Sequence, residues 1–137
     1  MARTVRELMT ADPRTVEPTT STVEAAQIMR EEDAGRVPVV EGDQLVGIVT
    51  DRDIVLRVVA EARDPRTVTV GEIASRQLVT IDPEQSVDEA ARLMAEHQVR
   101  RLPVVEEDGQ LVGIVAQADI ALAEPRQAVQ MPEEISK

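Results

Sequence analysis

The sequence predicts an α/β fold made of two copies of one unit, and the clearest observation is an internal repeat. Residues 35–56, GRVPVVEGDQLVGIVTDRDIVL, return at residues 100–122 as RRLPVVEEDGQLVGIVAQADIAL. In each copy two apolar runs of strand length flank a short acidic turn that contains glycine, which predicts a β-hairpin. The second run then changes to polar residues with an aspartate, and to Ile and Leu at helical spacing. Each hairpin is therefore expected to lead directly into a helix.

The segments that precede each hairpin repeat as well. Residues 4–9 and 69–73 each place apolar residues on one face of a helical turn. Residues 15–18 and 80–83 are short β-prone segments that end in a proline, which cannot continue a strand ladder, and we interpret them as first strands. The order expected in each copy is helical turn, strand, helix, strand, strand, helix.

Capping signals place the helices. In an S-x-x-E capping box the serine side chain accepts a backbone N–H and the glutamate bonds back to the serine N–H. Two such boxes begin the main helices, and prolines end the closing helices expected at residues 54–62 and 120–123. The boxes are Ser21 with Glu24 and Ser86 with Glu89.

We expect one repeat at residues 1–68, a second at 69–125 and a tail at 126–137. Each repeat is too small to bury much apolar surface alone, so the two should pack on each other. The tail carries two acidic residues, one proline and scattered apolar positions. It is expected to be mobile or to form a short docking helix.

Composition restricts the classes of partner. Apolar residues make up 42% of the 137 residues and none is Phe, Tyr or Trp, so the core must be aliphatic and a planar ligand could not stack on an aromatic ring. A net charge of -11 argues against nucleic acid and anionic membranes, which are bound through Lys and Arg. No segment has the character of a signal peptide or a membrane span, so we expect a cytoplasmic protein.

Catalysis and metal binding are not expected. The sequence has no pair of carboxylates, no nucleophile with a base and no Gly-rich phosphate loop, so we expect no enzyme activity. The lack of cysteine excludes disulfides and thiolate metal sites. His97 has no second His or Cys with which to hold a metal, and a cation at a helix end suits the helix dipole.

The V-P-V-V run before the hairpin, the G-I-V-T-D-R-D run after it and the presence of two copies resemble a tandem pair of CBS domains, also called a Bateman module. The resemblance covers residues from about 5 to 124. The run H-Q-V-R-R-L-P-V-V is similar to the stand-alone actinobacterial type, the hypoxic-response CBS proteins. The resemblance implies two βαββα repeats packed through their sheets about a pseudo-twofold axis, with two clefts that can each take AMP, ADP, ATP or S-adenosylmethionine.

In the first implied cleft, a hydroxyl at Thr50 and free N–H groups at the helix start would suit a phosphate, and the Asp53 carboxylate could accept the ribose hydroxyl protons. In the second, Ala116 replaces the hydroxyl while Asp119 keeps the ribose position, so the first is expected to bind more tightly. The T-x-x-D pattern is equally a plain helix cap that needs no ligand. Strand residues would line the adenine pocket, and the full set of candidate ligand-binding residues is Thr15, Val16, Arg36, Val37, Pro38, Thr50, Asp53, Thr80, Ile81, Arg101, Leu102, Pro103 and Asp119.

Two functional hypotheses follow. In the first, the chain is a regulatory ligand-sensing module that requires no cofactor and binds an adenosyl compound in the clefts between repeats. In the alternative, it is a ligand-free dimerising module for protein interaction. Both include a protein target and a homodimer through small and Met-rich helical faces. Those faces lie at residues 22–32, 54–60, 87–97 and 119–123.

Overall fold

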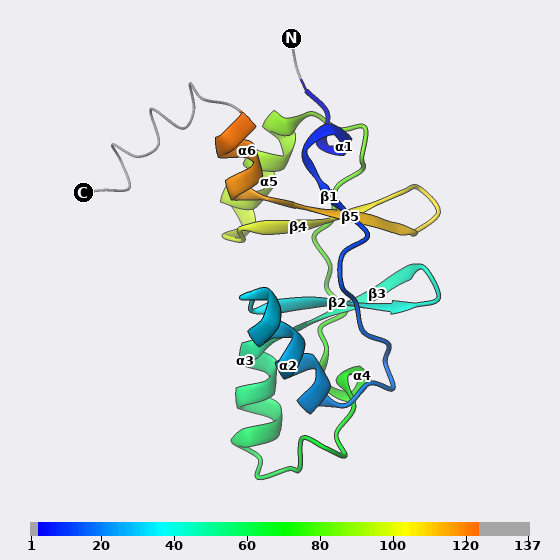
Figure 1. The fold of residues 1–137 in the computed structure, drawn as a ribbon, viewed down its shortest axis with the longest axis vertical. Helices are drawn as coiled ribbons and strands as arrows, with labels where there is room; N and C mark the ends of the chain where they lie inside the picture. The colour runs from blue at the N-terminus through cyan, green and yellow to red at the C-terminus, as the bar shows by residue number, and fades with distance from the viewer. Residues whose placement is uncertain (1–2, 124–137) are drawn as a thin grey trace, which may run out of the picture. The chain divides into compact units, whose positions relative to one another are not determined.

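The computed structural model describes residues 3–123, which form a mixed fold of helices and antiparallel strands (Figure 1). These residues divide into two compact units. Unit 2 holds residues 14–78 and the short segment 109–111. Unit 1 holds the described residues up to 13, residues 79–108 and those from 112 onward. The predicted fold class, with helices and strands alternating in two copies, is confirmed.

Both leading helices are present, and each packs in the unit that holds the hairpin of the other repeat. Helix α1 (Val5–Leu8) belongs to unit 1, where the Val5 N–H donates to the Gln85 carbonyl at 2.9 Å. Helix α4 (Val70–Ile73) belongs to unit 2. The side chains of Val5 and Val70 are completely buried. Each hairpin is therefore covered by a leading helix that the sequence pattern assigns to the other copy.

The compact units consequently do not coincide with the sequence repeats expected at 1–68 and 69–125. A repeat in sequence marks a copied segment, whereas a compact unit is defined by the side chains that share a core. The tail expected at 126–137 lies outside the described residues.

The hairpin of unit 2 consists of β2 (Arg36–Glu41) and β3 (Gln44–Thr50), which pair antiparallel as predicted. The register places Arg36 opposite Thr50, at the end of β3 where the chain enters the following helix. The N-terminal end of β2 therefore lies beside the strand-to-helix junction.

Unit 1 contains a three-stranded sheet in the order β1 (Thr10–Ala11), β5 (Leu111–Ala116), β4 (Arg101–Val105). Strand β1 pairs antiparallel with β5, with Thr10 opposite Ile114. The hairpin of the second repeat is thus extended by a strand from the beginning of the chain.

The first strands expected at residues 15–18 and 80–83 are reduced to single bridging residues. Val16 lies parallel to β2, donating its N–H to the Pro38 carbonyl at 3.0 Å and accepting the Val40 N–H at 2.8 Å. Ile81 makes the equivalent bridge beside β4. Because the proline that follows each segment has no N–H to donate, the ladder does not continue.

The main helices α2 (Thr22–Glu32) and α5 (Val87–His97) begin where the sequence predicts. The side chains of Ser21 and Ser86 each accept the backbone N–H of the residue three positions further on, at 3.2 and 3.1 Å. These bonds satisfy one orphan donor at each helix start.

A reciprocal capping box lies at the N-terminus of each leading helix. Glu72 accepts the Thr69 N–H at 2.9 Å, and this bond, followed by the contact with Arg63, lowers the pKa of the Glu72 carboxyl. Hydrogen bonds from Thr4 lower the pKa of Glu7 in the same way. A carboxylate that accepts N–H bonds is stabilised in its charged form.

The closing helices begin earlier than expected. After β3 the chain forms α3 (Asp51–Ile54) and continues as a π-helix, η1 (Val55–Val59), in which the Ala60 N–H donates to the Val55 carbonyl at 2.8 Å. After β5 it forms α6 (Gln117–Ala123). No helix within residues 3–123 is long and apolar enough to cross a membrane.

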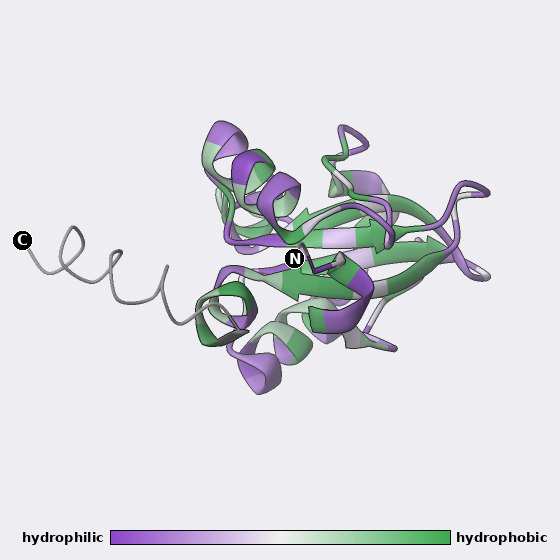
Figure 2. Cartoon of the chain, turned by 90° about the horizontal axis from the view of Figure 1, so that it is seen from above, coloured by the Kyte–Doolittle hydropathy of each residue, from purple (hydrophilic) through white to green (hydrophobic). Residues whose placement is uncertain are grey.

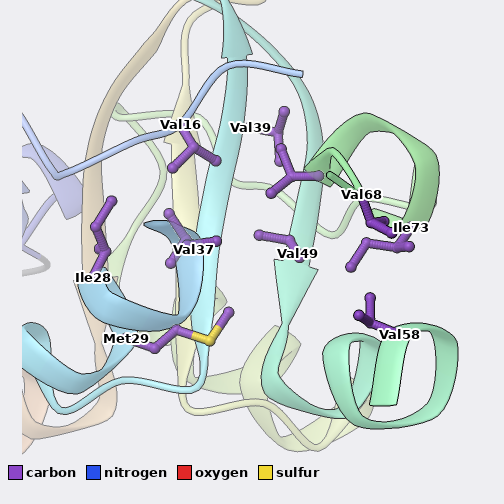
Figure 3. Close-up of a cluster of buried hydrophobic side chains, with 11 residues drawn as sticks. Val16, Ile28, Met29, Val37, Val39, Val49, Val58, Val68 and Ile73 are labelled. Atoms are coloured by element: carbon purple, nitrogen blue, oxygen red, sulfur yellow. The ribbon is translucent and has the colours of Figure 1, made fainter. Parts of the chain in front are cut away.

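Each unit has its own aliphatic core. In unit 2 the strands contribute Val37, Val39 and Val49, which meet Ile28 and Met29 of α2 (Figure 3). The strands are mostly hydrophobic and the turns are mostly hydrophilic, while the helices carry residues of both kinds (Figure 2). The expected aliphatic core is confirmed. The corresponding cluster of unit 1 is Val5, Ile81, Val87, Ala90, Met94, Leu102, Val104, Val115 and Ile120.

Candidate functional site

Part of the candidate ligand residues lie at two strand-to-helix junctions, one in each unit, and these are Arg36, Thr50, Asp53, Arg101 and Asp119. We define the unit 2 junction as Gly35 and Arg36 with residues 50–53, and the unit 1 junction as Arg100 and Arg101 with residues 116–119. Each consists of the beginning of one strand of the hairpin, the end of the other and the first turn of the closing helix. All residues of each junction belong to a single unit.

At the unit 2 junction a reciprocal capping box joins Thr50 to Asp53. Asp53 Oδ2 accepts the Thr50 N–H at 2.9 Å, and Thr50 Oγ1 accepts the Asp53 N–H at 3.0 Å. The hydroxyl uses a lone pair in this bond and keeps its own O–H for another acceptor. The helix-cap interpretation of T-x-x-D is therefore confirmed, and it leaves the Thr50 proton available.

The expectation of free N–H groups at this helix start is wrong. The Asp51 N–H donates to the Gly35 carbonyl at 2.9 Å, and the Arg52 N–H donates to Asp51 Oδ1 at 2.7 Å. With the Asp53 N–H bonded to Thr50, the first three amides of α3 all have acceptors within the chain. The sequence argument missed this because it did not give Asp51 a role.

The Asp53 carboxylate is only 14% exposed and has one oxygen bonded to the backbone. Its other oxygen, Oδ1, lies 3.9 Å from Nε of Arg57, one helical turn further on. Arg57 also donates to the Ile73 carbonyl at 3.4 Å. A ribose at Asp53 would therefore meet one oxygen that faces a guanidinium, a cation that the sequence argument did not include although its i,i+4 spacing from Asp53 was visible.

The unit 1 junction has the same backbone plan with different side chains. Asp119 Oδ2 accepts the Ala116 N–H at 2.9 Å, which matches the bond at the other junction. The Gln117 N–H donates to the Arg100 carbonyl at 2.8 Å. Ala116 supplies no hydroxyl, so the second half of the capping box is absent here.

The strand residues proposed for the adenine pocket are mostly core residues. Val16, Val37, Ile81 and Leu102 are between 0 and 4% exposed and belong to the two aliphatic clusters (Figure 3). Such side chains can shape the floor of a pocket, but most of their surface already contacts the protein. Pro38 and Pro103 are also buried.

Thr15 and Thr80 are half-buried and lie beside the bridging residues Val16 and Ile81. Because successive residues of an extended segment point their N–H and C=O groups to opposite sides, the backbone of each threonine points away from the hairpin. The backbone groups that face away from the hairpin are therefore those of the two threonines, because the bridging residues bond to β2 and β4.

The two arginines among the candidate ligand residues are on the surface. Arg36 is exposed and stands directly opposite Thr50, and Arg101 is exposed at the start of β4. Both are placed at the junction of their own unit, where a guanidinium could reach an anionic group.

The sequence model of the CBS domain family matches the chain twice, at residues 5–60 and 70–126. The chain belongs to the CBS domain family. The resemblance inferred from the sequence motifs is thereby confirmed, and the two matches make the chain a tandem CBS pair.

Curated relatives support the stand-alone type of CBS pair. The CBS domain-containing protein YhcV of Bacillus subtilis is 46% identical over 118 residues, which cover 86% of this chain and 83% of YhcV. Hypoxic response protein 1 of Mycobacterium tuberculosis is 43% identical over 127 residues, which cover 92% of this chain and 88% of that protein.

Solved structures of CBS pairs are similar over most of this chain. Hypoxic Response Protein I with two coordinated zinc ions has a TM-score of 0.77 and 43% identity, covering 88% of this chain and 98% of that one. CBSX2 in complex with AMP has a TM-score of 0.74, 28% identity and coverage of 93% and 97%. The CBS pair of MJ0100 in complex with 5′-methylthioadenosine and S-adenosyl-L-methionine has a TM-score of 0.77, 28% identity and coverage of 93% and 99%.

The structure of Hypoxic Response Protein I contains two coordinated zinc ions, and we find no comparable group of metal ligands in the described part of this CBS pair. Within residues 3–123 no group of three or more His, Cys, Asp or Glu side chains is arranged as a metal ion requires. Histidine and cysteine are the usual zinc ligands, and the sequence has a single histidine and no cysteine.

Proposed function

We propose that this CBS pair is a regulatory module that senses an adenosyl compound, with one candidate site at each strand-to-helix junction. The observation that carries the proposal is the repeated aspartate. Asp53 and Asp119 each fix one carboxylate oxygen on the backbone N–H three residues earlier, at 2.9 Å in both units. An aspartate held in this way presents its second oxygen in a defined direction, which suits the paired hydroxyls of a ribose.

The adenosyl class is supported by the neighbours that bind AMP, 5′-methylthioadenosine and S-adenosyl-L-methionine. These ligands share adenine and ribose and differ at the 5′ position. The aliphatic surroundings of Thr15 and Thr80 fit a base that is bound by backbone hydrogen bonds and apolar contact instead of aromatic stacking.

Isothermal titration with AMP, ATP, S-adenosylmethionine and 5′-methylthioadenosine tests the proposal. We expect saturable binding of at least one of them, with no more than two events per chain. NAD serves as a control for the size of the 5′ substituent, because it carries a whole second nucleotide at the 5′ position of its adenosine. A lack of heat and of thermal stabilisation with every adenosyl compound would transfer support to the ligand-free interaction module.

The exposed apolar face of η1 favours a homodimer as part of either hypothesis. Val55, Leu56 and Val59 are 53, 46 and 64% exposed, and Leu122 of α6 is 83% exposed. Apolar side chains grouped in this way on a helix are typical of a surface covered by a partner. Val58 of the same helix is completely buried, so these three side chains lie on the face of η1 that is turned away from the core.

Val59→Asp should therefore convert a dimer to a monomer, since a charge placed on a buried interface has no partner. Light scattering at micromolar concentration measures the mass. Gln77→Asp, at an exposed position in the segment that connects α4 to α5, adds the same charge and should leave the mass unchanged. A wild-type mass of one chain would contradict the prediction.

A further inference from the structure

The two junctions share their backbone hydrogen bonds but differ in charge at one pair of positions. Asp51 donates its N–H to the Gly35 carbonyl at 2.9 Å, and Gln117 donates its N–H to the Arg100 carbonyl at 2.8 Å. The first pair places a carboxylate at the helix start beside a residue without a side chain. The second places a neutral amide beside an arginine.

The Asp51 carboxylate has a defined position. Its Oδ1 accepts the Arg52 N–H at 2.7 Å, which holds the side chain against the first turn of α3. A Cβ added to Gly35 would lie only 2.8 Å from Asp51 Oδ2 and 3.3 Å from Oδ1. The carboxylate therefore occupies the space above Gly35, and a side chain at position 35 would have to displace it.

This position bears on the 5′ end of a bound adenosyl compound. If the ribose lies at Asp53, its 5′ substituent reaches the helix start around Thr50, where Asp51 contributes a fixed negative charge. Arg36, Arg52 and Asp51 are all exposed, but of these three only the Asp51 side chain is held in place by a hydrogen bond within the described residues. The remaining cation, Arg57, is engaged by Asp53 and the Ile73 carbonyl. An uncharged or cationic 5′ group meets no such repulsion.

We propose that Asp51 is a specificity-determining residue that makes the unit 2 site select adenosyl compounds without a phosphate, such as thioethers and sulfonium compounds. The inference rests on the proposed function. The unit 1 junction has Gln117 in place of the carboxylate and does not discriminate against phosphate in this way. For phosphorylated ligands this reverses the ranking expected from the Thr50 hydroxyl alone.

The test compares AMP with 5′-methylthioadenosine by isothermal titration, in an Asp119→Ala background so that the unit 2 site is titrated alone. Asp51→Asn keeps the acceptor for the Arg52 N–H and removes the charge. We expect AMP to bind about tenfold more tightly to this variant, the scale of one unit charge removed at short range in a partly solvated site. The affinity for 5′-methylthioadenosine should change by less than about twofold.

Two further variants strengthen the test. Asp43→Asn changes the net charge equally in the turn at the opposite end of the hairpin, and should leave both affinities unchanged. Gly35→Ala, which pushes the carboxylate away without removing it, should also improve AMP binding. Circular dichroism and the melting temperature check that each variant folds.

The outcomes separate the inference from the proposed function. Binding of 5′-methylthioadenosine together with an unchanged AMP affinity in Asp51→Asn would overturn the inference and leave the adenosyl site in place. An equal gain for both ligands, or an equal gain in Asp43→Asn, would also overturn it. If neither ligand bound the wild-type chain nor any variant, the proposed function would fail, and the inference with it.

Discussion

Deletion of residues 1–13 should loosen the second sequence repeat and spare the hairpin of the first. The deleted segment carries α1 and β1, in which Val5 is completely buried and Thr10 pairs with Ile114 of β5. Burial of a valine side chain contributes about 1.5–3 kcal/mol, so loss of this segment should lower the unfolding midpoint of unit 1 by roughly 10 °C. Hydrogen exchange followed by mass spectrometry should become faster in β4 and β5 and stay the same in β2 and β3.

A matched pair of point variants controls for the effects of truncation. Val5→Ala and Val70→Ala remove the same two methyl groups from completely buried positions in the two leading helices. Each should lose about 2–3 kcal/mol of stability. We expect Val5→Ala to accelerate exchange in β4 and β5, and Val70→Ala to do so in β2 and β3. The opposite pattern would mean that packing follows the sequence repeats.

This exchange of leading helices marks the boundary of what the sequence could predict about the fold. Local signals were sufficient for the hairpins and for the helix starts at Ser21 and Ser86, because a turn or a cap depends on residues a few positions apart. The pairing of Thr10 with Ile114 depends on residues at opposite ends of the chain. Two copies with the same pattern offer each leading helix two equivalent partners, and nothing in a repeat distinguishes them.

At the candidate site the sequence predicted where the polar residues lie better than which hydrogen bonds they make. Thr50, Asp53 and Asp119 do lie at strand-to-helix junctions, since the change from strand to helical periodicity marked the place. The bond from the Asp51 N–H to the Gly35 carbonyl could not be read from the pattern, because the two residues are distant in sequence. The bond from the Arg52 N–H to Asp51 Oδ1 is local and was overlooked.

The burial of the strand residues was partly visible. V-P-V-V is a continuous apolar run rather than an alternating one, and such a run is typical of a strand covered on both faces. Val37 is accordingly 2% exposed and Leu102 is completely buried. The family resemblance directed attention to these positions as pocket residues, whereas their apolar pattern already indicated a role in the core.

Asp53→Ala should remove the unit 2 binding event for 5′-methylthioadenosine. The variant loses the carboxylate oxygen proposed to accept the ribose hydroxyls, and a hydrogen bond to a charged group contributes about 1.5–3 kcal/mol, which corresponds to roughly ten- to a hundredfold in affinity. Isothermal titration should then show one event fewer per chain. Asp119→Ala should remove only the unit 1 event, so the double variant should bind no ligand.

The loss must be separated from damage to the helix start, because Asp53 also accepts the Thr50 N–H at 2.9 Å. Removal of a cap costs about 0.5–2 kcal/mol of stability and could distort the junction without involving any ligand. Thr50→Ala breaks the other half of the same capping box and keeps the carboxylate. Because 5′-methylthioadenosine has no phosphate to meet the Thr50 hydroxyl, its affinity should survive Thr50→Ala and fall in Asp53→Ala. Equal losses in the two variants would mean that the aspartate acts on the shape of the helix start and makes no contact with the ribose.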